Sequence, residues 1–454
     1  MPDGRLHRLL RRFTDIQPEE SRPALYLFLY FFLITFSIYI IKPVKENFLI
    51  SVPDAWWPYA DFITAGLIGF VVAFNTKLLN RLPRRGYFPC VAVFFILNLI
   101  AFWFIFEIKA QGSIPSLPVF AFIVFAFSLW SDIFIVMGVT NFWLTVNDVL
   151  NPRQAKRMVS FFVTGGLLGG ITGSLLTSRL ALAHSLGPAN LLLVCTGILL
   201  LQLIIINHLY AEQKELHKDV TMGSREEKPS YLASLRIIRG DKYLRILAGA
   251  LASAIIVGTL INYQFKIAVK QAYPDVAART SFLASFLFAM LLISTIFHLF
   301  STRPILKNFG IRLGLLIAPS VLCLGTLAVF LFPAAGLIMW ACLIRGSDKT
   351  LDNTISQSVR ELLYMPIPAS IKYEAKIFID MFVNKLAVGF GAALYWILYR
   401  VSSFEHKTHT AKIHELGIPV ICFTVVCIIL IWKIHAEYLS VVKRDLSRKW
   451  QDAH

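Results

Sequence analysis

Two lysines at matching positions in the chain are suited to binding an anion inside a membrane. Lys45 lies in IKPVKENFLISVPD, from Ile41 to Asp54, and Lys266 lies in QFKIAVKQAYPD, 221 residues further on. Ionisable groups within apolar helices usually face a wet cavity or a partner, so the pair predicts a central anionic site. Both lysines are also far enough along their helices to extend toward lipid head groups, and this alternative stays open.

Other polar residues in the apolar runs extend this candidate site. Asn262 lies one helical turn before Lys266, and Asp132 lies in the middle of an apolar run. Arg360 has a planar guanidinium that can clamp a phosphate, although an ion pair with Glu361 or Asp148 explains it equally well. We therefore predict two groups of residues. The substrate-binding group is Lys42, Lys45, Asn262, Lys266 and Arg360. The coupling or selectivity group is Glu46 and Asp132. Lys42 and Glu46 are four residues apart and can alternatively pair with each other.

A further polar group is expected toward the cytoplasmic ends of the helices. Asn147 and Asp148 precede an Asn-Pro turn, where they either gate the transport path or cap a helix. Asp380 and Asn384 are four residues apart and share a helical face. The predicted gating residues are Asn147, Asp148, Glu361, Asp380, Asn384 and Lys385.

The sequence contains none of the common catalytic or metal-binding motifs. Its six cysteines all lie in apolar runs without metal-ligand spacing. Gly165, Gly169 and Gly173 are spaced by four, which predicts close helix packing. They do not form a phosphate loop, because no strand precedes them and no Gly-Lys-Ser/Thr follows. We expect no enzymatic activity, no catalytic or metal-binding residue and no cofactor.

Composition places these residues in a membrane protein. Of the 454 residues, 57% are hydrophobic and 16% are charged, and the mean hydropathy is +0.66. That leaves too little polar surface for a soluble globule of this size. Apolar runs of about 20 residues without period-two alternation predict helices rather than a β-barrel. The expected spans are 24–50, 59–79, 87–107, 118–147, 157–182, 188–210, 244–270, 281–302, 311–332, 334–358, 376–400 and 416–438.

Sequence repetition divides these twelve spans into two parallel halves. LLNRLPRR from Leu78 resembles ILKNFGIR from Ile305, and QAKRMVSFFV from Gln154 resembles EAKIFIDMFV from Glu374. We expect an all-α, major facilitator-type fold with the substrate site between two six-helix repeats. Its parts are an amphipathic segment (1–23), an N-terminal bundle (24–210), a linker (211–243), a C-terminal bundle (244–439) and a tail (440–454).

Basic residues collect in alternate loops, which predicts the orientation of the chain. They precede the first span and follow the second and fourth, and they are also present in the linker and the tail. The positive-inside rule then predicts that both termini lie in the cytoplasm. We expect the protein to be located in the inner membrane. The net charge of +17 is largely this signal, so we expect no nucleic-acid binding. We expect a monomer in the lipid bilayer with a small anionic substrate.

Three longer motifs resemble the ATP/ADP translocases, the nucleotide transporters of intracellular bacteria and plastids. The motifs are IIKPVKENFLIS from Ile40, NFWLTVNDVLNPRQAKR from Asn141 and VRELLYMPIPASIKYEAKIFID from Val359. The resemblance implies a major facilitator fold and ties Lys45 to nucleotide handling. It also implies that Glu361, Tyr364, Pro366 and Asp380 are retained.

Departures from the family pattern raise the positive charge of the expected site. Arg360 replaces a family lysine, Ser128 and Asn262 fall where the family has glutamates, and Ser356-Gln357 replaces Phe-Asp. We therefore expect transport of a nucleotide or related phosphorylated anion by alternating access, with exchange or ion coupling. Two alternatives stay open. One is transport of an amphipathic anion such as a lysophospholipid, and the other is a membrane scaffold or sensor that has lost exchange.

Overall fold

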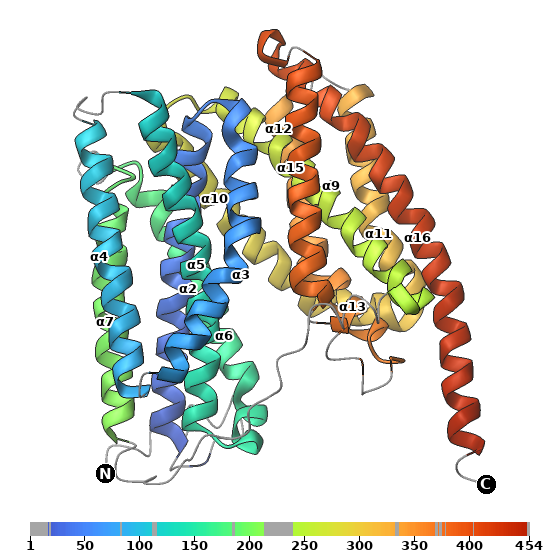
Figure 1. Cartoon of the computed structure of the whole chain (residues 1–454), viewed down its shortest axis with the longest axis horizontal. Coiled ribbons are helices and arrows are strands. Elements are labelled where there is room, and N and C mark those ends of the chain that lie inside the picture. Colours follow the sequence, from blue (N-terminus) through green and yellow to red (C-terminus); the bar gives the residue numbers. More distant parts are fainter. Residues whose placement is uncertain are drawn as a thin grey trace. The chain divides into compact units, whose positions relative to one another are not determined.

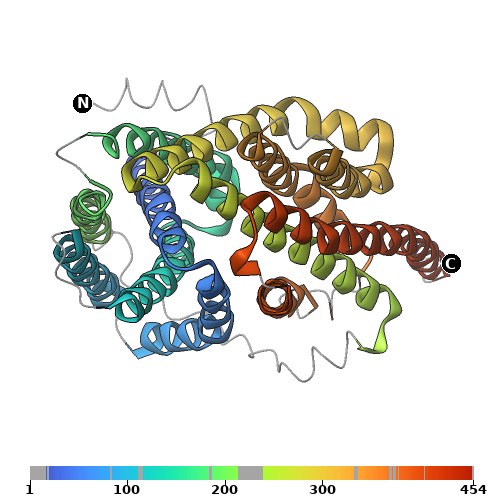
Figure 2. The same ribbon diagram turned by 90° about the horizontal axis from the view of Figure 1, so that it is seen from above.

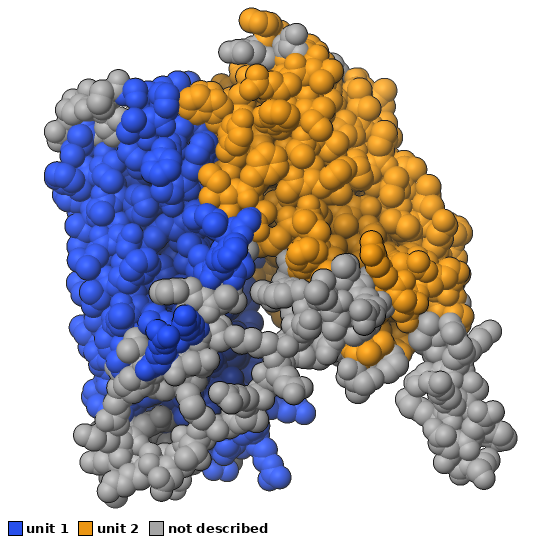
Figure 3. Space-filling view, in the orientation of Figure 1, with its two compact units in different colours: residues 1–52, 66–224, 273–291 blue, residues 53–65, 225–272, 292–454 orange. Residues whose placement is uncertain are grey.

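The computed structural model describes most of the chain as helices (Figure 1). The described residues are 17, 20–81, 84–110, 116–183, 187–212, 239–331, 336–367, 371, 375–376, 378–402 and 404–451, and they contain helices and turns but no strand. The first 16 residues of the expected amphipathic segment and most of the expected linker lie outside these ranges. Clustering of contacts separates two compact units, which are described in turn below (Figure 3).

Unit 1 is built around one long helix from the start of the chain. This helix, α2 (Ser21–Ser51), packs against α5 (Leu117–Val149), α6 (Pro152–Leu180) and α7 (Leu191–Glu212), and α4 (Arg84–Ala110) packs against α7. Leu27, Ile34 and Ile41 of α2 are almost completely buried. Their spacing of seven residues keeps them on one face of the helix, where they form part of the apolar core.

Unit 2 repeats this packing pattern with helices from later in the sequence. Here α9 (Lys242–Ala272) packs against α12 (Leu337–Leu351), α15 (Asn384–Val401) and α16 (His409–Gln451), and α11 (Arg303–Leu331) packs against α16 (Figures 1 and 2). Both ends of α9 lie 221 residues after the ends of α2, the same offset that separates Lys45 from Lys266. Thus the sequence repeat corresponds to a repeat in structure.

The second helix of each repeat contributes to both units. The helix α3 (Trp57–Arg81) follows a short 3-10 turn (Asp54–Trp56), and α10 (Val276–Phe297) occupies the matching place later in the chain. Residues 53–65 belong to unit 2, and residues 273–291 belong to unit 1. Each unit is therefore completed by the start of a helix from the other half of the sequence.

Unit 2 also contains irregular helical turns beside polar residues. A π-helical turn (Asp352–Ser356) joins α12 to α13 (Gln357–Leu363), and a second one (Phe378–Val383) precedes α15. Further short turns follow α10 (His298–Thr302) and precede α16 (Phe404–His406). Because π turns change which side chains share a helical face, they frequently occur at functional sites.

Among the described residues, nine helices are long and apolar enough to cross a membrane. The protein is therefore an all-helical, multi-pass membrane protein, as the composition predicts. Three expected spans have no such helix. The helix α3 covers most of 59–79, α12 with α13 covers most of 334–358, and α15 covers most of 376–400. The total of twelve spans stays a prediction.

Glycines of α6 lie directly against the backbone of α2. A Cβ added at Gly165 would lie 3.0 Å from Phe28 O, and one at Gly173 would lie 2.6 Å from Phe36 O. At Gly169 it would overlap Phe32 O and Thr35 Oγ1. The three contacted phenylalanines are spaced by four on α2, as the glycines are on α6. A glycine face therefore lets the two backbones approach closely.

Replacing Gly169 with alanine is expected to destabilise unit 1. The added methyl group meets a backbone carbonyl that cannot rotate away, and overpacking of this kind costs about 1–3 kcal/mol. The matched control is Gly197→Ala on α7, because a Cβ there meets nothing within 4 Å. Thermal unfolding in detergent should show a lower melting temperature for Gly169→Ala than for the wild type. The control should melt at or above the wild-type temperature, and equal values for the two variants would contradict this account of the packing.

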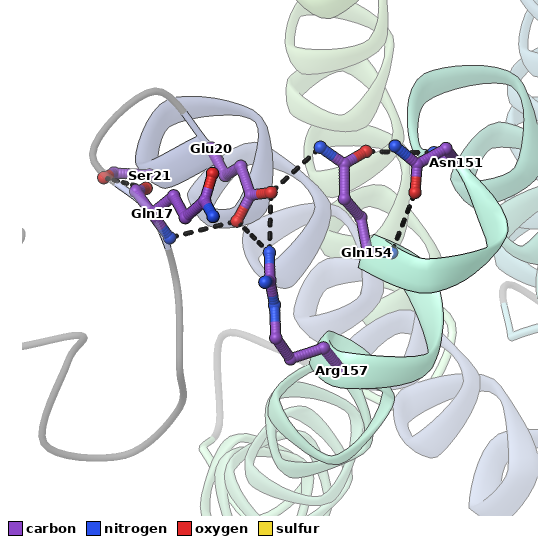
Figure 4. A network of polar contacts seen from close by, with 6 residues as sticks. All are labelled: Gln17, Glu20, Ser21, Asn151, Gln154 and Arg157. Carbon is purple, nitrogen blue, oxygen red and sulfur yellow. Dashed lines mark hydrogen bonds and ion pairs between the residues drawn. The ribbon is translucent and has the colours of Figure 1, made fainter.

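A polar network holds the start of α2 against the start of α6 (Figure 4). Glu20 is 7% exposed, and its carboxylate accepts hydrogen bonds from Arg157 Nη2 at 2.6 and 2.5 Å and from Gln154 Nε2 at 2.9 Å. Asn151 and Gln154 form a capping box that begins α6. A motif singled out in the sequence, NPRQAKR, therefore has a structural role at the beginning of this helix.

Candidate binding cavity

Unit 2 contains a cavity of about 350 Å³ that is lined by both apolar and polar side chains. Helices α9, α11 and α16 supply mostly aliphatic side chains, among them Leu251, Leu322 and Ile431. The charged and amide side chains of the lining are Asp61, Asn262, Arg345, Asp348, Lys349, Asp352, Arg360 and Asn384. Ligand sites in transporters combine these two kinds of surface, since an apolar wall strengthens the few polar contacts.

Arg345 is held at the cavity wall by two acceptors. Its Nη1 donates to Asp348 Oδ2 at 3.1 Å, one turn along α12, and to the carbonyl oxygen of Gly258 on α9, also at 3.1 Å. A Cβ at Gly258 would be in ordinary contact with Asp348 Oδ1 at 3.4 Å, which shows that this pair lies close to α9. Lys349 Nζ lies 3.8 Å from Asp348 Oδ2. Two cations therefore share one carboxylate.

Arg360 reaches the same cavity from α13. Its Nη2 donates to Asp352 Oδ1 at 2.9 Å across the π-helical turn. This is a different carboxylate from the two that the sequence suggested as partners. Glu361 accepts hydrogen bonds from Lys376 instead, at 2.7 and 2.8 Å, and Asp148 accepts one from the Tyr210 hydroxyl at 3.0 Å.

The formal charges of the described residues that line the cavity sum to zero. Arg345, Lys349 and Arg360 are cationic, while Asp61, Asp348 and Asp352 are anionic. An incoming phosphate therefore meets guanidinium and ammonium groups that are already oriented by carboxylates. Its oxygen atoms can add to these groups or replace the carboxylates, because a guanidinium offers five N–H donors.

Lys45 and Asp132 meet within unit 1. Lys45 Nζ donates to Asp132 Oδ1 at 2.8 Å, and the two side chains are 14% and 25% exposed. Residues predicted separately as substrate-binding and coupling groups thus form one ion pair between α2 and α5. Lys42 Nζ lies 4.4 Å from the centroid of the Tyr39 ring, and both Lys42 and Glu46 are half-buried.

Lys266 is 2% exposed, and its Nζ lies 5.7 Å from the centroid of the Tyr263 ring. It is not among the residues that line the cavity, whereas Asn262, one turn earlier, is. Of the predicted gating residues, Asn384 lines the cavity, Asn147 is exposed and Lys385 is half-buried. The side chain of Asp380 lies outside the described part of the structure.

Asp348, Lys349 and Asp352 were not among the site residues predicted from the sequence, and Arg345 and Asp61 were not noticed in it at all. Each of the last two is a charged residue close to an apolar stretch, the signal that identified Asp132, so both were open to detection. Asp61 accepts a hydrogen bond from the Tyr263 hydroxyl. Its position at the cavity depends on the start of α3 joining unit 2, which no local sequence pattern indicates.

Comparison with solved structures shows which fold the chain adopts. A mutant of the nucleoside transporter NupG aligns with 90% of this chain and 99% of its own, at 13% identity and a TM-score of 0.61. A D-xylose-proton symporter aligns with 91% of this chain and 97% of its own, at 14% identity and a TM-score of 0.59. The fold is that of the major facilitator-type membrane transporters.

Sequence comparison then identifies the family. The model of the TLC ATP/ADP transporter family matches residues 107–441, and the chain belongs to this family. ADP,ATP carrier protein 4 of Rickettsia typhi is 20% identical, with 94% of both chains covered. ADP,ATP carrier protein 1 of Chlamydia pneumoniae is 22% identical, with 87% of both covered. The plastidic ATP/ADP-transporter of Solanum tuberosum is 23% identical over 84% of this chain and 68% of its own.

Proposed function

We propose that this protein carries nucleotides such as ATP and ADP across a membrane by alternating access. The observation that carries the proposal is the convergence of Arg345, Lys349 and Arg360 on one cavity in a chain of this family. Guanidinium groups suit phosphate because their paired N–H donors match two of its oxygen atoms. Asn262 supplies a neutral hydrogen-bonding group for the sugar or base, and Asn384, which we assign to the gating group, also lines the cavity.

Binding in this cavity is a competition between phosphate oxygens and carboxylates. Phosphate displaces Asp348 from Arg345, or Asp352 from Arg360, and the displaced carboxylate must find a new partner. Protonation of that carboxylate, or the departure of a previously bound anion, keeps the charge of the cavity balanced. Either event links substrate binding to exchange or to ion coupling.

The residues predicted from sequence have further roles in this proposal. Lys45, supported by Lys42, binds an anion within unit 1 in exchange for Asp132. Lys266 and Glu46 adjust the charge near the path. The gating group acts at the cytoplasmic ends of the helices. It comprises Asn147, Asp148, Glu361, Asp380, Asn384 and Lys385.

Basic residues in alternate loops support an inner-membrane location with both termini in the cytoplasm. The proposed protein is a monomer of two six-helix halves, 24–210 and 244–439, and binds a small anion rather than nucleic acid. As a transporter it changes no covalent bond in its substrate.

Uptake of labelled ATP, ADP and NAD by proteoliposomes containing the purified protein tests this function. We expect uptake of at least one of these nucleotides above the level of protein-free liposomes, and competition by the unlabelled compound. Mass spectrometry of the purified protein provides an independent arm. A co-purified lysophospholipid, together with no nucleotide uptake, would contradict the proposal and favour the alternative cargo.

A further inference from the structure

A buried carboxylate at the start of residues 53–65 bridges two lysines of unit 2. Asp54 Oδ1 lies 2.6 Å from Lys270 Nζ at the end of α9, and its Oδ2 lies 3.2 Å from Lys412 Nζ in the first turn of α16. The side chains of Asp54 and Lys412 are 10% and 8% exposed. The carboxylate thus uses one oxygen for each ammonium group, as a phosphate would.

Aromatic rings surround the two lysines. Lys270 Nζ lies 5.3 Å from the Trp57 ring centroid, and Lys412 Nζ lies 5.7 Å from that of Phe404. Tyr395 stacks on Trp57 and also on Tyr263, with ring centroids 6.4 and 4.3 Å apart. All four rings are buried in this state. Cations and aromatic π faces are the two components that recognise the phosphate and the base of a nucleotide.

The Asp54 carboxylate is shared by two ammonium groups. Asp54 supplies one negative charge between two lysines, and the hydroxyl of Tyr395 donates to its backbone oxygen at 3.4 Å. Burial raises the pKa of Asp54, but the charges and hydrogen bonds of Lys270 and Lys412 outweigh it and leave the pKa below its ordinary value. A lowered pKa means that the contact is fully formed at neutral pH and is lost as the pH falls through that value.

The matching residue in the other repeat behaves differently. Asp275 corresponds to Asp54 in the repeated Pro-Asp turn, yet its carboxylate accepts a hydrogen bond from the backbone N–H of Ala278 and caps α10. A role in starting a helix therefore explains Asp275. It does not explain why Asp54 turns instead toward two buried ammonium groups.

We propose that Lys270 and Lys412 form a second anion site, for the phosphate of the transported substrate, and that Asp54 occupies this site in the state described here. The proposal rests on the function proposed above. When residues 53–65 leave, Trp57 leaves with them, and the two lysines become available to a nucleotide together with the rings of Tyr263, Tyr395 and Phe404. The same segment carries Asp61, whose contact with Tyr263 lies at the binding cavity. One segment therefore closes the lysine site and forms part of the wall of the cavity.

Removal of the Asp54 carboxylate should expose the site to added anions. We expect Asp54→Ala to bind pyrophosphate about tenfold more tightly than the wild type, because a competing intramolecular contact lowers the apparent affinity. Isothermal titration calorimetry on the purified full-length chain measures this affinity. Adding Lys270→Gln to Asp54→Ala should abolish the gain. Adding Lys407→Gln should leave it unchanged, because Lys407 pairs with Glu415 and not with Asp54.

A second measurement follows the segment itself. Ala60 is 3% exposed, so a cysteine there should react slowly with a charged thiol reagent. The background is a variant without the six native cysteines that keeps the wild-type melting temperature. Ala60→Cys should react at least about tenfold faster when combined with Asp54→Ala, and Asp54→Glu should retain slow labelling, since it keeps the carboxylate.

Two results would overturn the proposal. In one, Ala60→Cys becomes reactive in the Asp54→Ala background while pyrophosphate binds no more tightly than to the wild type. In the other, the reactivity stays at its original level, which means that Asp54 does not hold the segment. Failure of the proposed function is a separate outcome. In that case pyrophosphate binding rises as expected, but proteoliposomes take up no nucleotide.

Discussion

Replacing Arg345 with glutamine is expected to lower nucleotide uptake by about a hundredfold. Loss of a charge-assisted contact to phosphate costs about 1.5–3 kcal/mol, and the upper end of this range corresponds to that factor. Glutamine is polar but shorter than arginine, and it removes the positive charge between Asp348 and the substrate. The concentration dependence of uptake should show the loss chiefly as a raised KM.

The controls for Arg345 separate binding from folding. Arg312→Gln removes a guanidinium that lies 3.7 Å from the Trp432 ring centroid, outside the cavity lining, and should leave uptake close to normal. Arg345→Gln combined with Asp348→Asn removes both members of the ion pair. This double variant should recover the wild-type melting temperature without recovering uptake. Recovery of uptake in the double variant would mean that Arg345 only neutralises Asp348.

Replacing Lys45 with methionine is expected to produce the second large effect. The substitution removes the ion-pair partner of the half-buried Asp132. Because the pair is partly exposed, its loss costs less than the ~3–5 kcal/mol of a fully buried pair. We expect a lower melting temperature and uptake below a tenth of the wild-type rate. Uptake assays and thermal unfolding on the same preparations measure both quantities.

A double variant distinguishes the two roles of Lys45. Lys45→Met with Asp132→Asn removes both charges, so its melting temperature should return toward that of the wild type. Its uptake should stay low if the ammonium group also contacts the substrate. Normal uptake by the single Lys45→Met variant would remove Lys45 from the transport path.

Much of the fold could be predicted from the sequence because membrane helices leave a strong local signal. Apolar runs of sufficient length predicted the nine spans for which the described residues contain a long apolar helix, and the 221-residue repeat matched α2 to α9 at both ends. The assignment of residues 53–65 to unit 2 could not be predicted. Contacts such as that between Asp54 and Lys412 join residues 358 positions apart and depend on packing that no short window contains.

Some of the residues named from the sequence lie together in the structure. Asn262, Arg360 and Asn384, each identified as a polar residue in or beside an apolar helix, line one cavity, and their roles there stay predictions. The repeat suggested equivalent roles for Lys45 and Lys266, but the structure gives them different surroundings. Lys45 pairs with Asp132, whereas Lys266 is buried near Tyr263. Equivalent backbone positions do not ensure equivalent partners, because the neighbouring helices of the two repeats carry different side chains.

Calorimetric titration of the purified protein with ATP and with adenosine tests the central claim most directly. If the cavity binds a nucleotide through its phosphates, the wild type binds ATP more tightly than adenosine, and Arg345→Gln combined with Arg360→Gln loses that preference. Equal affinity of the wild type for the two compounds, or a preference for ATP that survives in the double variant, would contradict the account.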